Sequence, residues 1–291
     1  MIGKLGKLGV WASLDLMTSA ELAGFAQAVE QAGFSALWHP EAVGRNSLVS
    51  SSWLLANTTR LIVATGIANI YARDAQAMVA ARNGLNEQSG GRFILGMGVS
   101  HAPLVDDLRG HDYGKPVATM RAYLEAMGKA VYESPKPSDK PLTLLAALGP
   151  KMLELSRDLA DGAHPYNVTP EFTAEARAIL GPDKLLCVEQ MVAPAPDAET
   201  GRKLGRAILS IYIGLPNYRN TWLRQGFDES DFENGGSDRL IDAMVAWGDD
   251  EAIRDRVRAH WDAGADHVCI QLLGQHGTPD IAALERIAQG L

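Results

Sequence analysis

The sequence contains few cysteines and no long hydrophobic run. Cys187 and Cys269 are the only cysteines among 291 residues, and both lie in apolar, strand-like runs. Two buried thiols fit a reducing cytoplasm better than a disulfide framework. No apolar run reaches the ~18 residues that a membrane-spanning helix needs. We therefore expect a cytoplasmic protein that does not bind a membrane.

Basic residues are outnumbered. The chain has 27 Lys and Arg against 35 Asp and Glu, which gives a net charge of −8. This balance argues against a nucleic-acid or anionic-membrane surface. The N-terminal segment MIGKLGKLGVWASLDL has two lysines, but Ser13 and Asp15 interrupt its short apolar part. A first strand fits this segment better than a signal peptide.

Several catalytic motifs are missing. No G-x-G-x-x-G follows a strand-like run, which disfavours a Rossmann nucleotide site. No G-x-S-x-G elbow occurs, so acyl-enzyme chemistry has no support. The seven histidines form no H-x-H or H-x-x-x-H pair. Metal-dependent hydrolysis is therefore disfavoured, and we expect no metal site.

What the sequence does contain is a repeated strand–helix unit, clearest over residues 60–101. Residues 60–66 are apolar and β-branched, which is typical of a buried strand. Asp74 can cap the following helix, and Gly90 with Gly91 can end it. A second apolar run, 93–99, follows. Two such strands joined by a helix predict a parallel pair with a right-handed crossover.

Eight units of this kind follow one another along the chain. The runs expected as strands are 8–12, 34–39, 60–66, 93–99, 142–147, 162–165, 185–192 and 267–272. Eight strands that alternate with helices predict a closed (β/α)8 TIM barrel, because closure leaves no free edge strand. A doubly wound open sheet is the alternative. We expect a single domain over residues 1–291, with insertions at about 101–116 and 214–248. The second insertion is expected to be a lid that selects the substrate.

In such a barrel the active site lies at the carboxyl ends of the strands. His39 ends the second expected strand, and its ordinary pKa suits proton transfer near neutral pH, so we predict that it is the acid/base. Glu41 is expected to orient it or to act itself. His101 and His164 also end strands and compete for the role, and a purely structural histidine is the simpler alternative. His111, His260, His267 and His276 are expected to be surface or packing residues.

The segment AALGPKMLEL, residues 146–155, has the features of a helix start. Gly149 suits the N-cap and Pro150 the first helical position. The amides of Lys151 and Met152 would then be free, and with the Lys151 ammonium they could bind an anion. An ordinary capped helix explains the same pattern without any ligand.

Two motifs carry a resemblance to a known family. TGIxNxYxR, at residues 65–73, is followed after a helix by SGGRFxLGxGxS, at residues 89–100. The pair, and the chain as a whole, resembles the bacterial-luciferase-like oxidoreductases, and within them the branch that uses the deazaflavin coenzyme F420. The resemblance implies a cofactor ring backed by a non-prolyl cis peptide, for which Gly66–Ile67 is the candidate, and a cofactor phosphate near Lys151. The implied cofactor-binding residues are Gly66, Ile67, Asn69, Gly98, Ser100, Ala147, Leu148, Gly149, Pro150, Lys151 and His164.

The function that this resemblance implies is hydride transfer between F420 and a small organic substrate. One alternative is an FMN-dependent monooxygenase, which would need a separate flavin reductase as partner. Another is a non-catalytic flavin-binding relative. Relatives of this kind are commonly dimers, so a homodimer is expected.

Overall fold

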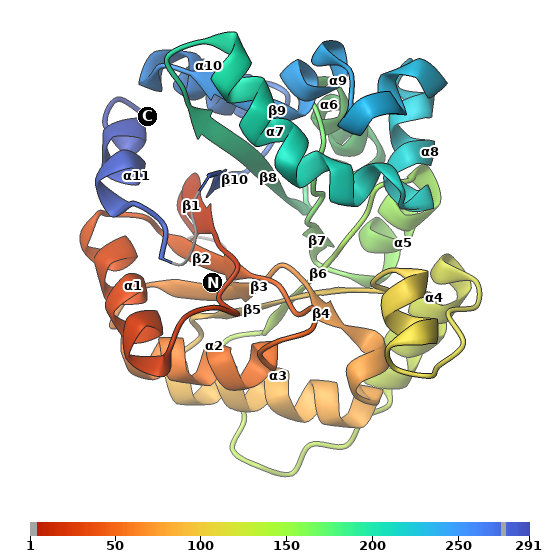
Figure 1. The fold of residues 1–291 in the computed structure, drawn as a ribbon. Helices are drawn as coiled ribbons and strands as arrows, with labels where there is room; N and C mark the ends of the chain where they lie inside the picture. Colours follow the sequence, from red (N-terminus) through yellow and green to blue (C-terminus); the bar gives the residue numbers. More distant parts are fainter. Residues whose placement is uncertain (1–4, 275–277) are drawn as a thin grey trace.

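The strands form one closed parallel barrel. The computed structural model describes residues 5–274 and 278–291, and Figure 1 shows its strands surrounded by helices. Within these residues the ladder runs through β10 (His267–Leu272), β1 (Leu8–Trp11), β2 (Ala36–His39), β3 (Ile62–Thr65), β5 (Phe93–Gly98), β6 (Leu142–Leu145), β7 (Gly162–Ala163) and β8 (Leu185–Pro194). Strand β8 pairs with β10 again and closes the ring, and these pairings are parallel. The predicted (β/α)8 barrel is confirmed, and the open sheet is wrong.

Helices surround the barrel, and the two helix starts expected at Asp74 and Gly149 are found there. They are α1 (Ser19–Gln31), α2 (Ser47–Ala56), α3 (Ala75–Ser89), α4 (Pro116–Gly128), α5 (Pro150–Leu159), α6 (Pro170–Leu180), α7 (Ala198–Ile213), α10 (Asp250–Asp262) and α11 (Ile281–Ala288). The Asp74 side chain accepts from the Ala77 amide at the start of α3, and Gly90 ends that helix in the left-handed conformation. Such caps satisfy amides that the first helical turn leaves free.

Alternation along each strand divides the core into two layers. Ala36 and Trp38 on β2 belong to a cluster inside the barrel, whereas Leu37 between them packs in the layer between strands and helices. Successive side chains of a strand point to opposite faces, so this division repeats around the ring. It decides which residues at the strand ends can reach the barrel mouth.

The two insertions differ in character. The first contains the short π-helix η3 (Pro103–Asp107). The second, which was expected to be a lid, contains α8 (Pro216–Arg224), η4 (Glu229–Gly235), α9 (Asp238–Met244) and the strand β9 (Val245–Gly248). Strand β9 pairs in parallel with the C-terminal part of β8. Helices α7, α8 and α9 lie together on one side of the barrel (Figure 1), around their own core that includes Tyr218, Trp222 and Phe232.

A second short strand lies between β3 and α3. This strand, β4 (Ala68–Asn69), pairs with the end of β5, and the single-turn 3-10 helix η2 (Ile70–Ala72) follows it. The main-chain step from β3 to β4 therefore brings residues 66–69 against Gly98. These are the residues in which the sequence placed part of the cofactor site.

We predict that Gly96→Ala is strongly destabilising. A Cβ at this position would lie 1.9 Å from the Thr65 carbonyl oxygen, and backbone cannot yield as a flexible side chain can. Overpacking of this kind costs ~1–3 kcal/mol or more, which urea unfolding would measure as a loss of stability. The matched control is Gly84→Ala in α3, where a Cβ meets nothing within 4 Å. It should gain ~0.5–1 kcal/mol, because alanine favours helix. Equal effects at both glycines would contradict the prediction.

Candidate active site

Residues at the barrel mouth follow from the alternation of the strands. Trp11, Trp38 and Cys187 belong to the cluster inside the barrel. One alternation further along their strands lie residues that face the same interior at its carboxyl end. Gly66, Glu189 and Gln271 lie two positions beyond residues of this cluster, and Gly98 lies four positions beyond Ile94. Tyr166 lies two positions beyond His164, whose ring stacks on Trp38.

The segments that follow β3 and β5, where the sequence placed part of the cofactor site, lie against each other and form one wall of the barrel mouth. The peptide bond between Gly66 and Ile67 is cis, as the resemblance implied. The Trp11 Nε1–H donates to the Gly66 carbonyl over 3.2 Å. A Cβ on Gly98 would lie 3.0 Å from the Ile67 side chain. Ser100 follows in the left-handed conformation, with a φ of 59°, and its carbonyl accepts from the Tyr113 hydroxyl.

His164 offers one unpartnered nitrogen beside this wall. Its ring stacks on Trp38 with centroids 4.3 Å apart, and its Nδ1 lies 2.9 Å from the Cys187 carbonyl. Because a carbonyl only accepts, Nδ1 carries the proton of the neutral ring and Nε2 is an acceptor. Burial lowers the pKa of His164 to about 4, which keeps the ring neutral. Its Nε2 is buried and has no partner within the described chain.

His39 does not face the barrel mouth, so this part of the sequence prediction is wrong. Trp38 occupies the interior face of β2, and His39 therefore points outward, where its Nε2 lies 2.9 Å from the Ser51 hydroxyl of α2. The side chain is 1% exposed, and burial lowers its pKa to about 4. A neutral, enclosed histidine in the helix layer is a packing residue, which was the simpler of the two interpretations.

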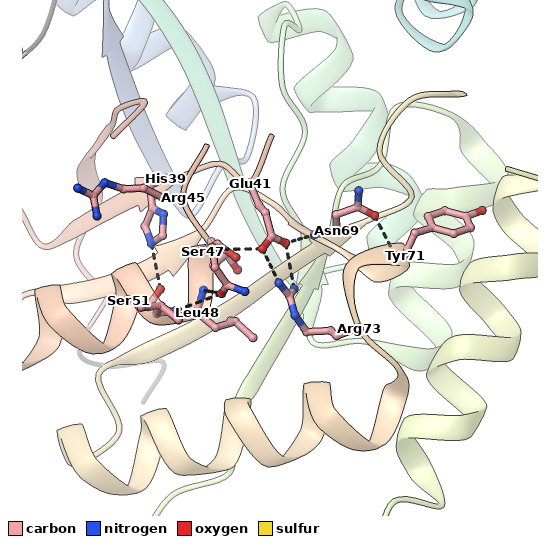
Figure 2. Close-up of polar contacts among 12 residues, drawn as sticks. His39, Glu41, Arg45, Ser47, Leu48, Ser51, Asn69, Tyr71 and Arg73 are labelled. Atoms are coloured by element: carbon pink, nitrogen blue, oxygen red, sulfur yellow. Dashed lines mark hydrogen bonds and ion pairs between the residues drawn. The ribbon is translucent and has the colours of Figure 1, made fainter. Parts of the chain in front are cut away.

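Glu41 pairs with Arg73 rather than orienting His39. Figure 2 shows both carboxylate oxygens of Glu41 directed at the Arg73 guanidinium. The same carboxylate accepts from the Ser47 amide at 3.2 Å and the Asn69 amide at 2.9 Å. Burial favours the neutral acid, but the hydrogen bonds from Arg73 and these amides outweigh it, so the pKa of Glu41 is lowered. Glu41 thus joins the segments that follow β2 and β3 at the rim of the barrel.

Asn69 is held by the same network. Its side-chain oxygen accepts from the Tyr71 amide at 2.9 Å and caps η2 (Figure 2). The residue is 1% exposed. Its main contribution in this geometry is to fix the turn that carries Ile67.

The start of α5 is where the sequence placed it, but one predicted feature is wrong. Gly149 is the N-cap and Pro150 the first helical residue. The Met152 amide is not free, because it donates to the Gly149 carbonyl over 3.0 Å. Lys151 is exposed, and Ala147 before the helix is buried. An anion could therefore meet the Lys151 side chain, but not the two open amides that were expected.

Helix α8 is fastened over this part of the mouth. The Leu148 carbonyl accepts from the Thr221 hydroxyl at 3.1 Å and from the Arg224 guanidinium at 3.0 Å. The Trp222 Nε1–H donates to the Asn167 carbonyl over 3.2 Å. The second insertion thus rests directly on the strand ends.

The mouth is lined by aromatic rings that were not predicted from the sequence. Tyr166 lies 5.3 Å from Trp11 between centroids, and its hydroxyl bonds to the Tyr212 hydroxyl and to Gln271, each at 2.9 Å. Tyr218 packs between Tyr212 and His101. Only Tyr166 could have been inferred from the sequence, because it follows His164 by two residues, and alternate side chains of an extended segment point to the same side. Tyr212 and Tyr218 come from α7 and α8 and carried no pattern.

Glu189 is the other residue that was missed. It is 1% exposed, and its Oε2 accepts from the Asn167 amide at 3.3 Å. Burial raises its pKa to about 8, so the carboxyl is largely protonated at neutral pH. The signal was a single carboxylate within the apolar run LLCVEQMVA, residues 185–193. A lone acid in a buried strand is costly, which makes it a candidate functional group.

The chain matches a known protein family over most of its length. A sequence profile described as luciferase-like monooxygenase matches residues 5–267. The chain belongs to the luciferase-like monooxygenase family. It is 26% identical to a putative coenzyme F420-dependent oxidoreductase of Mycobacterium tuberculosis, and the match covers 97% of this chain and 98% of that protein.

Solved structures of the luciferase-like fold agree with this barrel. The coenzyme F420-dependent tetrahydromethanopterin reductase from Methanopyrus kandleri superposes with a TM-score of 0.79 at 18% identity, covering 98% of each chain. The oxygenating constituent of 3,6-diketocamphane monooxygenase from Pseudomonas putida, solved with FMN, gives 0.69 at 14% identity, covering 98% of this chain and 97% of that one. At these identities the likeness shows the fold.

The remaining histidines of the described chain form no second site. His260 is buried between Thr173 and Gln190, and His267 accepts from the Trp38 indole, so both are packing residues. His111 is exposed, and His276 lies outside the described residues. Among residues 5–274 and 278–291, no cluster of three or more His, Cys, Asp or Glu could hold a metal ion. No helix in that part of the chain is long and apolar enough to cross a membrane.

We predict that Glu189→Gln changes how stability depends on pH. Below pH 4.5 the carboxyl of Glu189 is protonated in folded and unfolded chains alike. Between that value and about 8, the unfolded chain releases the proton and the folded chain keeps it. Stability of the wild type should therefore fall by up to roughly 4 kcal/mol relative to Glu189→Gln as the pH rises. Urea unfolding at pH 5 and pH 8 measures the difference.

Glu30→Gln is the matched control, with the opposite sign. Burial opposes ionisation of Glu30, but the amides of Arg60, Leu61 and Thr59 outweigh it, so its pKa is lowered. The Glu30 contribution is present above the unfolded pKa and is lost as the pH falls through the folded pKa. Glu30→Gln should therefore cost more stability at pH 8 than in acid. A Glu189→Gln variant that keeps the wild-type pH profile would contradict the assignment of a protonated carboxyl.

Proposed function

We propose that the protein transfers a hydride between coenzyme F420 and a small organic substrate, and that it acts as a homodimer. The observation that carries the proposal is the wall of Gly66, Ile67 and Gly98 at the barrel mouth, beside the unpartnered Nε2 of His164. A Cβ on Gly66 would meet Trp11 and His164, and one on Gly98 would meet Ala146 and Ile67, so the two glycines let these side chains pack directly on the main chain and form one surface of the mouth. A flat ring with polar edges fits such a surface. The end-to-end match to an F420-dependent relative favours the deazaflavin over other ring systems.

The residues divide the work of such a reaction. The cofactor, when bound, supplies the hydride chemistry. The wall would hold its ring, and the His164 Nε2 would accept one hydrogen bond from a polar ring edge. Trp11, Tyr166 and Tyr218, whose rings contact one another, would cover the bound ring and exclude water, and the Glu41–Arg73 pair would keep the rim in place. Lys151 would attract the cofactor's phosphate at the start of α5.

The second candidate is an FMN-dependent monooxygenase supplied by a flavin reductase. It is favoured by the likeness to the FMN-containing monooxygenase structure. FMN and F420 offer a similar flat ring to the same wall. The two functions differ in their use of oxygen, so cofactor affinity and oxygen consumption separate them.

The proposed cofactor class is tested by titration. We expect F420 to quench the tryptophan fluorescence of the protein at micromolar concentration, because Trp11 and Trp38 lie beside the wall. NADPH should bind poorly, because no dinucleotide motif follows any strand. FMN that binds tighter than F420, with oxygen consumed on turnover, would replace the first proposal by the second. Tight NADPH binding alone would contradict both.

We predict that Lys151→Ala weakens F420 binding by ~10-fold or more, because a charge-assisted contact contributes ~1.5–3 kcal/mol. The loss should shrink as salt rises, since Lys151 is exposed. The matched control is Lys129→Ala: Lys129 is also exposed but follows the end of α4, and helix ends lie at the opposite face of the barrel. Riboflavin, which lacks the phosphate, should bind the Lys151→Ala variant and the wild type alike. An equal loss for riboflavin would show general damage instead.

A further inference from the structure

Glu189 and Asn167 carry three buried polar atoms at the barrel mouth that have no partner among residues 5–274 and 278–291. Glu189 is 1% and Asn167 2% exposed. The one hydrogen bond between them is donated by the backbone amide of Asn167 to the Glu189 Oε2. Over the described residues, the Glu189 Oε1 and both side-chain atoms Oδ1 and Nδ2 of Asn167 have no hydrogen-bond partner. Asn167 is also held at a φ of 57°, in the left-handed region.

Burying these polar atoms without hydrogen bonds destabilises the fold unless a ligand supplies the missing partners. Each buried polar atom without a partner costs ~1–3 kcal/mol, and native proteins keep few of them. The main chain of Asn167 is meanwhile fixed from above by the Trp222 indole of α8. The unpartnered atoms therefore lie at a defined junction between the barrel and the second insertion, beneath the aromatic residues of the mouth.

The groups that face Glu189 are uncharged near neutral pH. They are Tyr166 after β7, Tyr212 on α7, Tyr218 on α8 and Cys269 on β10. Burial raises the pKa of Tyr212 to about 12, and those of Tyr166, Tyr218 and Cys269 well above their ordinary values. Only burial and the Asn167 amide act on the Glu189 carboxyl, so no cation within the described chain compensates for its ionised form.

We propose that Glu189 and Asn167 form a subsite for the carbonyl group of an uncharged aromatic or conjugated substrate. This proposal rests on the proposed function, because it places the substrate across the Trp11–Tyr166 contact from the cofactor wall. The protonated Glu189 carboxyl donates a hydrogen bond to the carbonyl oxygen of the substrate, and the side-chain Nδ2 of Asn167 offers a second donor. The rings of Trp11, Tyr166 and Tyr218 supply an apolar, aromatic lining. Anionic substrates such as sugar phosphates would be buried here without a counter-charge and are disfavoured.

The test compares two probes of similar shape that differ in charge. Acetophenone is a neutral aromatic ketone, and benzoate is an anion with the same ring. Isothermal titration calorimetry gives their Kd for the wild type, Glu189→Gln and Glu189→Leu, with and without saturating F420. Glutamine keeps a donor and an acceptor of the same size, and leucine removes both.

We expect acetophenone to bind the wild type at pH 6.5 at least ~10-fold more tightly than benzoate does, because an unpaired charge is costly to bury. Glu189→Gln should stay within about 3-fold of the wild type, and Glu189→Leu should lose ~10-fold or more. As the pH rises through about 8, the wild type should lose acetophenone affinity by ~5-fold or more, because the carboxyl becomes an acceptor only. Glu189→Gln should show no such loss.

Glu30→Gln, which alters a buried glutamate in α1, should leave acetophenone affinity unchanged and so separates lost stability from lost contact. Unchanged affinity in Glu189→Leu, a wild-type profile without pH dependence, or tighter binding of benzoate would overturn the subsite. Should Glu189→Leu not fold, the pH profiles of the wild type and Glu189→Gln decide alone. If F420 binds normally while acetophenone fails these tests, only the subsite is wrong. If F420 itself does not bind, the proposed function fails.

Discussion

The parallel hydrogen-bonded ring is the constraint on which the rest of the structure depends. Val268 on β10 pairs with Leu8 on β1 and with Val188 on β8, so strands far apart in the chain meet and close the barrel. Closure in parallel brings all carboxyl ends to one face. The ring also fixes which alternate residues point inward, and that parity gives the mouth Gly66, Tyr166 and Glu189 while it sends His39 into the helix layer.

Burial sets the charge of the titratable groups inside the mouth, whereas hydrogen bonds set it at the rim. At the rim, hydrogen bonds from the Arg73 guanidinium and from two backbone amides keep the Glu41 carboxylate ionised. Inside the mouth the described residues provide no such compensation, so His164 stays neutral and Glu189 keeps its proton. The result is a polar but uncharged interior beneath a charged rim. A flat cofactor and an uncharged substrate are the ligands that suit this division, which links the two proposals.

The second insertion serves the site through contacts with main-chain atoms. Thr221 and Arg224 hold the Leu148 carbonyl, and Trp222 holds that of Asn167. These bonds join α8 to the loops that start α5 and α6. Tyr212 and Tyr218 then complete the aromatic lining from above. The lid that the sequence suggested is thus an ordered, packed element in this structure, and whether it opens stays a prediction.

The sequence by itself determined what depends on neighbours along the chain. Apolar periods and caps such as Asp74 and Gly149 predicted the strands, the helix starts and hence the barrel. The motif at residues 65–73 led through its family to the cis bond after Gly66. Only the tertiary structure decided partners that lie far apart in sequence. Glu41 pairs with Arg73 instead of its near neighbour His39. Glu189 is buried among side chains from α7, α8, β10 and the segment after β7, and this burial keeps its carboxyl protonated. The physical reason is that a side chain's face, its burial and its pKa are set by the packed ring as a whole.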